Sequence, residues 1–363
     1  MIIEAFLLLF LGCYVVQATL LTMTVRRIRD VRHQATPFVS VIVAARDEEQ
    51  NLAACLDSVL QQSYDSKLFE VIVVNDHSTD KTEDICRQFA ERHANLRHIN
   101  ATESPALRGK TNALDQGIGQ AKGEIILITD ADCTVPATWV ASTAQRYGPD
   151  IGIVGGLTVQ KAHSWFEGMQ SLDWVYLLGL AASTISLRIP LSTIGNNLSF
   201  RKSAYEEVGG YRKIPFSVTE DFMLFQAIVR SGKWNYLCPI DPEVLVTSQP
   251  CQTWRELIRQ KHRWGTGGLD MKLSGFIVGA IGFGLNVVLV CALLASSLPW
   301  FLVGLGVKLV CDYVFLRSIL KRQRRLDLLN YFLPFEGYFI AYVLALPFLV
   351  FLGGPVVWKG RSY

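Results

Sequence analysis

Long apolar runs lie near both ends of the chain, and a block of mixed polar and apolar segments lies between them. Residues 2–25 hold one charged side chain, Glu4, and are long enough to cross a bilayer as a helix, which takes roughly 20 apolar residues. Three further apolar runs follow towards the C-terminus, over residues 276–297, 300–320 and 331–353. The pattern predicts a transmembrane helix over residues 1–25 and a transmembrane region of about three helices over residues 276–353.

The central block, residues 36–272, is long enough for one large α/β domain. Short apolar runs of the kind that form buried strands end at Ala44, Asn75 and Thr129, and each is followed by a segment with helical features. Alternation of strands and helices, with strands that are apolar throughout, indicates a parallel sheet covered by helices on both faces. The block is therefore predicted to be one α/β domain.

Two segments of this block are predicted to lie at the membrane surface as interfacial helices. They cover about residues 163–189 and 253–269. The first is rich in Trp, Leu and Ala and contains Asp173, a composition that favours an amphipathic helix at the membrane surface. A buried core helix is the alternative for that segment.

Composition agrees with a membrane protein, because half of the 363 residues are hydrophobic and the mean hydropathy is positive. The net charge of +3 gives no reason to expect nucleic acid as a partner. The eight cysteines form no Cys-x-x-Cys pair and show no metal-ligand spacing with His, as expected of reduced cytoplasmic thiols.

Basic residues beside the apolar runs predict the topology. Arg26, Arg27, Arg29 and Arg32 follow the first run, and a second basic cluster covers residues 321–325. Cytoplasmic loops are enriched in Lys and Arg, so the N-terminus is predicted outside and the central block in the cytoplasm. The protein is thus expected in the inner (cytoplasmic) membrane, with its basic clusters against anionic lipid headgroups. Four alternating helices would leave the basic C-terminal tail outside, so a short or re-entrant last segment is an alternative.

The triplet Asp130-Ala131-Asp132 places two carboxylates at the carboxyl end of a predicted buried strand. Mg²⁺ and Mn²⁺ take oxygen ligands, and Mg²⁺ is usually held by one or two carboxylates plus substrate phosphates. Asp-x-Asp also occurs in turns, where Asp bonds its own backbone. Polar residues 45–49 and 75–78 follow two other strands, and ligands of such sheets bind outside the strand ends. The three clusters together favour a metal-bound nucleotide.

Lys110 opens a predicted helix and could face a phosphate, although no glycine-rich phosphate loop is present in the sequence. An ordinary basic helix start is the alternative, but a lysine at a helix N-terminus opposes the helix dipole. Glu220 and Asp221 open another predicted helix, where carboxylates also have a structural use.

Gln260, Arg263 and Trp264 share one face of the helix predicted from Thr253, because they are three and four residues apart. A planar cation beside an indole suits a phosphate and a sugar ring. Arg, Trp and Gln at a membrane boundary could equally be interface anchors.

In this order, between membrane helices, these motifs resemble the family-2 glycosyltransferases with a GT-A fold. The resemblance is to the membrane branch that contains cellulose, chitin, hyaluronan and poly-N-acetylglucosamine synthases and ceramide glucosyltransferase, and it covers nearly the whole chain. It implies a Rossmann-like, mixed and mainly parallel sheet in a cytosolic domain, joined to transmembrane helices. It also implies an inverting hexosyltransferase that uses Mg²⁺ or Mn²⁺ and moves a sugar from a UDP-sugar to a membrane-associated lipid or growing glycan.

The resemblance further implies roles for single residues. In the donor site Glu48 and Asp76 contact the uridine, Asp130 supports the ribose or the metal, and Asp132 ligates the metal. Lys110 belongs with these nucleotide-sugar contacts. The chain has Asn75 and Asp47 where the family often has Asp and Asn, respectively.

The remaining roles concern the reaction and the acceptor. Asp221 is the implied general base. Gln260, Arg263 and Trp264 hold the diphosphate and the acceptor sugar, and Glu220 is assigned to the acceptor with Trp264.

Two other functional classes are open on the residues alone. A membrane nucleotidyl- or phosphotransferase would use the same metal, carboxylates and lysine, and a membrane scaffold would bind a nucleotide without turnover. Among glycosyltransferases, a processive polysaccharide synthase is the alternative to an enzyme with a lipid acceptor. Four helices are few for a polymer channel, which favours a lipid acceptor or a short product.

Overall fold

The computed structural model describes residues 2–28, 30–271, 273–359 and 361–362. Arg29 of the first basic cluster and Lys272, the last residue of the predicted catalytic domain, lie outside the described residues. The chain forms two compact units. The α/β unit comprises Arg29–Val159 and Ser192–Gln249, and the helical unit comprises Met1–Ile28, Gln160–Leu191 and Pro250–Tyr363.

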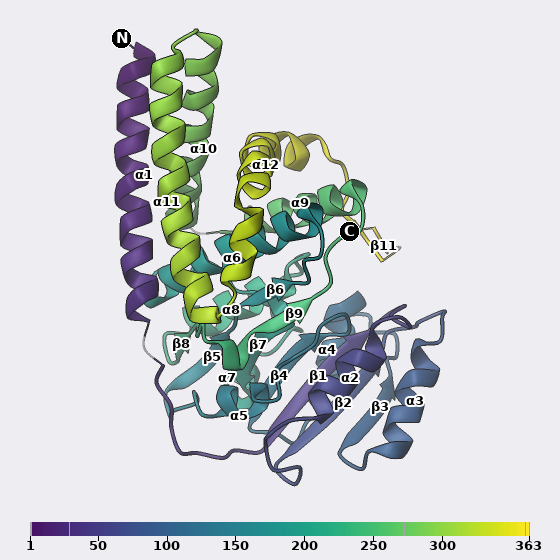
Figure 1. Ribbon diagram of the computed structural model, residues 1–363. Coiled ribbons are helices and arrows are strands. Elements are labelled where there is room, and N and C mark those ends of the chain that lie inside the picture. The colour runs from purple at the N-terminus through teal and green to yellow at the C-terminus, as the bar shows by residue number, and fades with distance from the viewer. Residues whose placement is uncertain (1, 29, 272, 360, 363) are drawn as a thin grey trace. The chain divides into compact units, whose positions relative to one another are not determined.

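The α/β unit is built on a seven-stranded sheet with the strand order β3-β2-β1-β4-β7-β5-β8 (Figure 1). β1 is parallel to β2 and β4, and β2 is parallel to β3. β7 is antiparallel to β4 and β5, whereas β8 is parallel to β5. The strands are β1 Val39–Ala45, β2 Phe69–Asn75, β3 Leu96–Asn100, β4 Ile125–Asp130, β5 Ile151–Gly155, β7 Leu198–Arg201 and β8 Asn235–Leu237; β6 Thr158–Gln160 pairs with β9 Val246–Ser248. The prediction of a mixed, mainly parallel sheet is confirmed.

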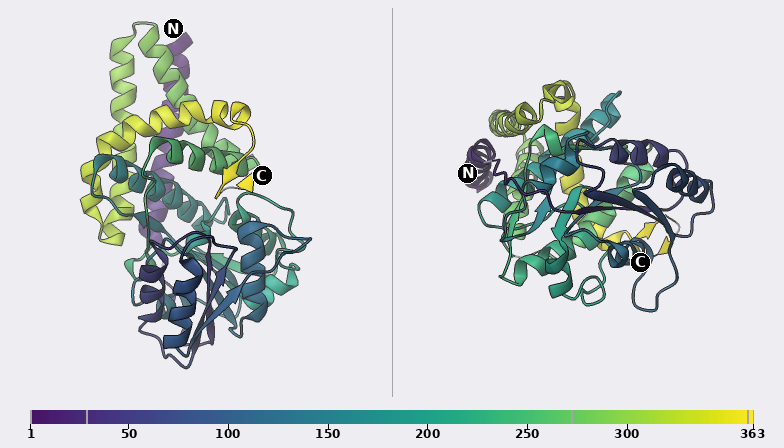
Figure 2. Two further views of the ribbon diagram at one scale, coloured as in Figure 1. Left: turned by 90° about the vertical axis from the view of Figure 1, so that its right-hand side faces the viewer. Right: turned by 90° about the horizontal axis from the view of Figure 1, so that it is seen from below.

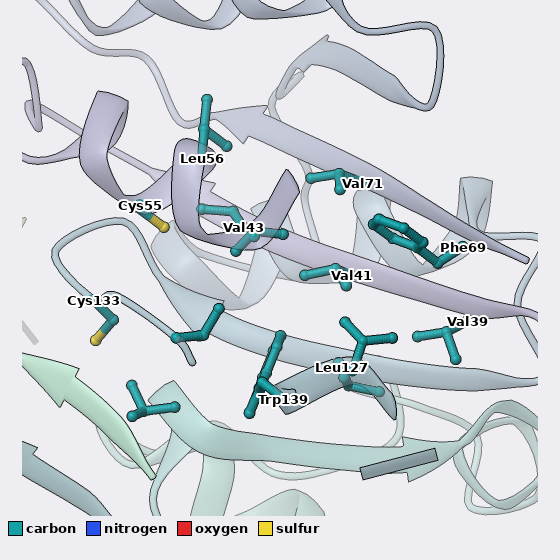
Figure 3. Packing of buried hydrophobic residues seen from close by; sticks show 14 of the residues in the cluster. Val39, Val41, Val43, Cys55, Leu56, Phe69, Val71, Leu127, Cys133 and Trp139 are labelled. Atoms are coloured by element: carbon teal, nitrogen blue, oxygen red, sulfur yellow. The ribbon is translucent and has the colours of Figure 1, made fainter. Parts of the chain in front are cut away.

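The core of the α/β unit lies against β1, β2 and β4, whose apolar runs are buried almost throughout. Val41 of β1 is in register with Val71 of β2 and Leu127 of β4, and the three side chains stack across the strands (Figure 3). Leu56 and Trp139 come from helices packed on the sheet. Full burial of such a side chain is worth about 1.5–3 kcal/mol, so this core fixes the strand ends that carry the polar clusters.

The helices of the α/β unit connect these strands. They are α2 Leu52–Leu60, α3 Thr82–Arg92, α4 Gly109–Gln120, α5 Trp139–Ala144, α7 Lys202–Glu207 and α8 Glu220–Arg230, with the 3₁₀ turns η1 Gly195–Asn197 and η2 Pro242–Val244.

In the helical unit, α1, α10 and α11 run side by side (Figures 1 and 2). α12 contains Pro347 and runs across their direction in the left view of Figure 2. Within the described residues, four segments are long and apolar enough to cross a membrane: Ile2–Arg27, Leu273–Leu294, Leu298–Gln323 and Leu326–Leu352. The unit's elements are α1 Ile2–Arg27, α6 Trp165–Ser186, α9 Trp254–Gly268, α10 Leu273–Leu294, α11 Leu298–Gln323, η3 Leu326–Tyr331, α12 Phe332–Leu352, β10 Val357–Trp358 and β11 Arg361–Ser362.

A buried polar cluster ties several of these helices together. Nζ of Lys308 on α11 lies 2.8 Å from Oδ2 of Asp312 and 2.6 Å from Oε2 of Glu336 on α12. The hydroxyl of Tyr14 on α1 donates to Asp312. Ionisable groups inside apolar helices are costly unless they are paired, so this cluster specifies how α1, α11 and α12 associate.

The segments predicted as interfacial helices form α6 and α9, and both belong to the helical unit. Each begins at a capping side chain. Ser164 accepts a hydrogen bond from the N–H of Glu167 in a capping box, and Thr253 accepts one from the N–H of Glu256. α6 is buried along most of its length, as the alternative of a core helix predicts.

Candidate active site

The three polar clusters of the sequence lie at one edge of the sheet. β1, β2 and β4 are adjacent and parallel, and the last residue pairs are Ala45 with Asn75 and Ala44 with Asp130. The segments that follow therefore leave the sheet at the same edge, where open α/β sheets bind ligands.

The loops after β1 and β2 are joined by hydrogen bonds into one rigid element. The N–H of Glu48 donates to the hydroxyl of Thr82 at 2.7 Å, and the N–H of Glu49 donates to Oδ2 of Asp80 at 3.1 Å. Arg46 donates from Nη1 to the carbonyl of Asp76 at 2.8 Å. These hydrogen bonds fix the backbone at Glu48 and at the buried Asp76, two of the residues predicted to contact the nucleotide-sugar.

Both departures from the family pattern have structural roles in these loops. Asp47 has a φ of +50° and accepts from the N–H of Thr79 at 2.8 Å. Asn75 accepts from the N–H of Ser78 at 3.2 Å and donates to Oδ1 of Asn100 at 2.9 Å. The side chains of Asp47 and Asn75 therefore shape the loops that carry Glu48 and Asp76.

Lys110 joins two of the predicted motifs. Its Nζ lies 2.6 Å from Oδ1 of Asp130, at the end of β4, and 3.1 Å from Oε1 of Glu220, at the start of α8. Burial by itself would lower the pKa of Lys110, but the carboxylates of Asp130, Glu220 and Asp221 outweigh it and raise the pKa. The side chain is therefore an ammonium among carboxylates of both motifs.

Asp221 follows Glu220 in the first turn of α8 and accepts from the N–H of Phe222 at 2.8 Å. Its neighbour is Gly195 of η1, where an added Cβ would lie 3.1 Å from both Cβ and Oδ2 of Asp221. Sequence reasoning missed Gly195, because only the folded chain brings these two segments together. The glycine leaves the space that the Asp221 carboxylate occupies.

Asp132 has a thiol neighbour in the next residue. Sγ of Cys133 donates to Oδ1 of Asp132 at 3.3 Å, and Sγ of Cys55 donates to the carbonyl of Asp130 at 3.4 Å. Burial, followed by the nearby carboxylates of Asp132 and Asp130, raises the pKa of both thiols. Protonated thiols are poor metal ligands. The Cys133 thiol instead donates to the Asp132 carboxylate, and the Cys55 thiol donates to the backbone carbonyl of Asp130.

The donor set at Asp130 and Asp132 fits a hard divalent cation. Within the described ranges, no group of three or more His, Cys, Asp or Glu side chains is placed to hold a metal by itself. Two carboxylates at a strand end nevertheless match the way Mg²⁺ is usually held, with phosphate oxygens and water completing the shell. Asp130 and Asp132 would be the protein ligands of a metal that arrives with a nucleotide.

The predicted residues of α9 belong to the helical unit. The ring of Trp264 lies 5.2 Å, centroid to centroid, from the ring of Trp174 on α6. Oε1 of Gln260 is buried and has no hydrogen-bond partner in the part of the chain that the structure describes. Gln260 thus offers an acceptor to a ligand hydroxyl or to water, and Arg263 completes the motif three residues later.

Comparison with known families decides the class of protein. Residues 5–363 match the model described as glycosyl transferase family 21. The chain belongs to this family. The match confirms the sequence-based prediction of a glycosyltransferase and favours sugar transfer over the nucleotidyl- or phosphotransferase alternative.

Two curated relatives illustrate the range of this glycosyltransferase group. The poly-β-1,6-N-acetyl-D-glucosamine synthase of Staphylococcus epidermidis is 28% identical over 251 residues, which cover 67% of this chain and 58% of the relative. The β-monoglucosyldiacylglycerol synthase of Nostoc sp. is 30% identical over 249 residues, covering 66% of this chain and 50% of the relative. The matched region thus spans about half the length of these relatives.

A solved structure supports the fold. The mannosyltransferase PcManGT from Pyrobaculum calidifontis, in complex with GDP-Man and Mn²⁺, aligns with a TM-score of 0.61 at 21% identity. The alignment covers 97% of this chain and 99% of that one. The prediction of a GT-A fold together with apolar helices is confirmed.

Proposed function

We propose that this glycosyltransferase moves a sugar from a UDP-sugar, with inversion, to a membrane-associated acceptor at the cytoplasmic membrane face. The observation that carries the proposal is the Lys110 bridge between Asp130 and Glu220, with Asp221 beside it. It joins the predicted metal-binding motif and the predicted base motif in one unit. A scaffold that only binds a nucleotide would not need a base there.

Donor binding is assigned to the edge of the sheet. Glu48 and Asp76 contact the uridine from braced loops, and Asp130 and Asp132 would hold Mg²⁺ or Mn²⁺. The metal, when bound, supplies positive charge that stabilises the diphosphate as it leaves. Lys110 adds a second cation, whose carboxylate partners keep it protonated. Donor phosphates would share this ammonium with Asp130.

Asp221 is assigned as the general base. It takes the proton of the acceptor hydroxyl while the acceptor oxygen bonds to the anomeric carbon and the bond from that carbon to the UDP oxygen breaks. The electron pair leaves with the diphosphate. One displacement inverts the anomeric carbon, so an α-linked UDP-sugar gives a β-linked product. An α-linked product would contradict this assignment.

On the basis of the motif, Gln260 and Arg263 are assigned to the nucleotide-sugar, Trp264 to the nucleotide-sugar and the acceptor, and Glu220 to the acceptor. A planar guanidinium suits the diphosphate, and an indole face suits a sugar ring. The names of the two relatives point in different directions, to a glycolipid and to a polysaccharide. Four candidate spans among the described residues favour a lipid or a short product over a long extruded polymer.

The class of transfer is tested with purified protein in lipid vesicles. UDP release from a panel of UDP-sugars is measured with and without diacylglycerol, and GDP-mannose serves as a comparison donor. Release that depends on a UDP-sugar and diacylglycerol supports the proposal. Pyrophosphate release would identify a nucleotidyltransferase, and a long ladder of labelled product would identify a polysaccharide synthase.

Asp221→Asn tests the base. Transfer should be abolished and UDP binding retained, because the amide cannot take the proton. Asp84→Asn, on the exposed side of α3, is the matched control and should keep full activity. If Asp221→Asn keeps activity, Asp221 is a structural residue of the first turn of α8.

A further inference from the structure

A lysine and an aspartate of the helical unit form a fully buried ion pair. Asp173 on α6 is 0% exposed and Lys261 on α9 is 1% exposed, and Nζ of Lys261 contacts Oδ2 of Asp173. Charged side chains are almost never buried so completely, and a buried pair often contributes less than apolar residues of similar volume. General stability therefore explains the pair poorly.

The pair lies beside the aromatic member of the acceptor motif. Nζ of Lys261 is 4.1 Å from the centroid of the Trp264 ring and 5.1 Å from that of Tyr342 on α12. Trp174, next to Asp173 in the chain, contacts the same indole, with its ring centroid 5.2 Å from that of Trp264. Both members of the pair thus act on one indole, Lys261 directly and Asp173 through Lys261 and its neighbour.

Apolar packing already holds α9 against the other helices. Phe166 on α6 lies 4.8 Å from Trp254 at the start of α9. Gly265, directly after Trp264, allows close approach of α12, since an added Cβ would lie 2.6 Å from Val350 and 2.7 Å from Leu346. The ion pair with its cation–π contact adds a further directional constraint, on the rotation of α9 and on the angle of the Trp264 ring.

The polar groups around this contact are incompletely satisfied. Oδ1 of Asp173 and Nε1 of Trp174 are buried without a hydrogen-bond partner in residues 2–28, 30–271, 273–359 and 361–362, and so is Oε1 of Gln260. Purely structural networks usually satisfy their buried polar groups. Unmet groups next to the Gln260 and Trp264 motif are what a hydroxylated ligand or water would satisfy.

We infer that Asp173 and Lys261 are positioning residues, which hold the indole of Trp264 at the angle needed to receive the acceptor sugar. The inference rests on the proposed function for the assignment of Trp264 to the acceptor. Its geometric part, the control of the Trp264 ring by the pair, stands without it. Removing the pair should therefore disturb the ring and the acceptor more than the donor.

The decisive experiment compares Asp173→Asn/Lys261→Met with wild type, both labelled with 5-fluorotryptophan in vesicles. Both charges are removed together, so no buried charge is left unpaired. The ¹⁹F resonance of Trp264 is assigned by its loss in Trp264→Phe. It should shift and broaden in the double variant and stay in place in the control Lys233→Met/Glu207→Gln, which removes an ion pair of the α/β unit. An unmoved resonance would overturn the inference.

Kinetics test the consequence with UDP-glucose as donor and dioleoylglycerol vesicles as acceptor. In the double variant the acceptor KM should rise and kcat should fall by roughly 10- to 100-fold, with the Kd for UDP unchanged. Lys261→Arg keeps the charge pair with Asp173, so its acceptor KM should stay close to that of the wild type. A folded double variant with wild-type kinetics would overturn the positioning role.

Folding and function are separated by two further readings. If the double variant does not fold, Asp173→Glu decides, since it keeps both charges and shifts their contact by one methylene. Its Trp264 resonance must move, and an unmoved one rejects the inference. A wild-type enzyme without transfer would count against the proposed function alone, because the Trp264 resonance still reports on the pair.

Discussion

The ammonium of Lys110 lies 2.6 Å from the Oδ1 atom of Asp130, so the first turn of α4 neutralises a carboxylate at the end of β4. The same ammonium reaches Glu220 at 3.1 Å. Two motifs that are far apart in the chain therefore share one cation, which offsets the negative charge of Asp130 and Glu220.

Among single substitutions at the carboxyl ends of these strands, Lys110→Met should reduce sugar transfer more than any other except a substitution of Asp221. It leaves the carboxylates of Asp130 and Glu220 facing each other without a cation. We expect transfer to fall about 100-fold, equivalent to about 2.7 kcal/mol, and stability to fall by about 1–3 kcal/mol. Steady-state kinetics and thermal unfolding measure both effects. Lys81→Met, at an exposed loop lysine, is the control, and normal transfer by Lys110→Met would remove Lys110 from the site.

Gly195→Ala should displace Asp221. The added methyl would lie 3.1 Å from Oδ2 of Asp221, closer than most carbon contacts, so the carboxylate must move by a few tenths of an ångström. We expect kcat to fall at least about tenfold with little change in the Kd for UDP. Gly119→Ala, at a site with nothing within 4 Å, should leave kcat unchanged. Equal activity of the two variants would show that Asp221 tolerates movement.

Chelation with EDTA should abolish transfer, and Mg²⁺ or Mn²⁺ should restore it. Asp132→Asn should raise the metal concentration needed for half-maximal rate. Loss of an outer-shell partner alone typically weakens metal binding about 10- to 100-fold, so loss of a direct ligand should weaken it at least as much. Cys133→Ala, which removes the thiol that orients Asp132, should have a smaller effect of the same kind. Full transfer in EDTA would argue against a metal.

Asn197→Ala should destabilise the α/β unit strongly. Its side chain accepts from Nε1 of Trp139 at 3.0 Å and donates to the carbonyls of Leu157 and Val244 at 2.7 and 2.8 Å. Each buried group left without a partner costs about 1–3 kcal/mol, so we expect a loss of about 3 kcal/mol or more. Trp139→Leu removes the indole from the same network and provides a second test. A melting temperature within a degree of wild type in Asn197→Ala would contradict this.

Asp80 should contribute stability that depends on pH. Partial burial would raise its pKa, but hydrogen bonds from the hydroxyl and N–H of Thr82 and from the N–H of Glu49 outweigh it and lower the pKa. A group with a lowered folded pKa stabilises above its unfolded pKa, about 3.9, and loses that contribution as pH falls through the folded pKa. Asp80→Asn should therefore lower the free energy of unfolding by less than about 1 kcal/mol at neutral pH. The difference from wild type should narrow below about pH 4 in thermal melts, and a gap that widens there would be inconsistent.

The sequence predicts the parts of the site that local pattern controls. The run Ile125–Ile128 is apolar throughout, so the strand and the position of Asp130 at its end follow from this continuous apolar run. The same holds for the ends of β1 and β2, whose shared edge follows from parallel pairing. Continuous apolar length likewise predicts the candidate spans.

Contacts between distant segments could not be predicted in this way. Nothing in the sequence near Lys110 says that it meets Glu220, or that Gly195 lies against Asp221, because tertiary packing alone brings them together. The burial of α6 depends in the same way on its neighbours, so its composition alone favoured an interfacial helix. The Asp173–Lys261 pair joins two segments that the sequence leaves unconnected.

The sheet order has a consequence for synthesis of the protein on the ribosome. β5 lies beside β7 and β8 and is not paired with β4, the strand made before it. Within the described residues, strands β1 to β4 pair with one another and with β7 alone, so they can assemble as soon as they emerge. β5 must wait while the whole of α6 is made, until β7 arrives to bridge it to β4. A nascent chain halted after β5 and before β7 would expose the unpaired backbone groups of β4, and a chaperone or the membrane surface would have to shield them.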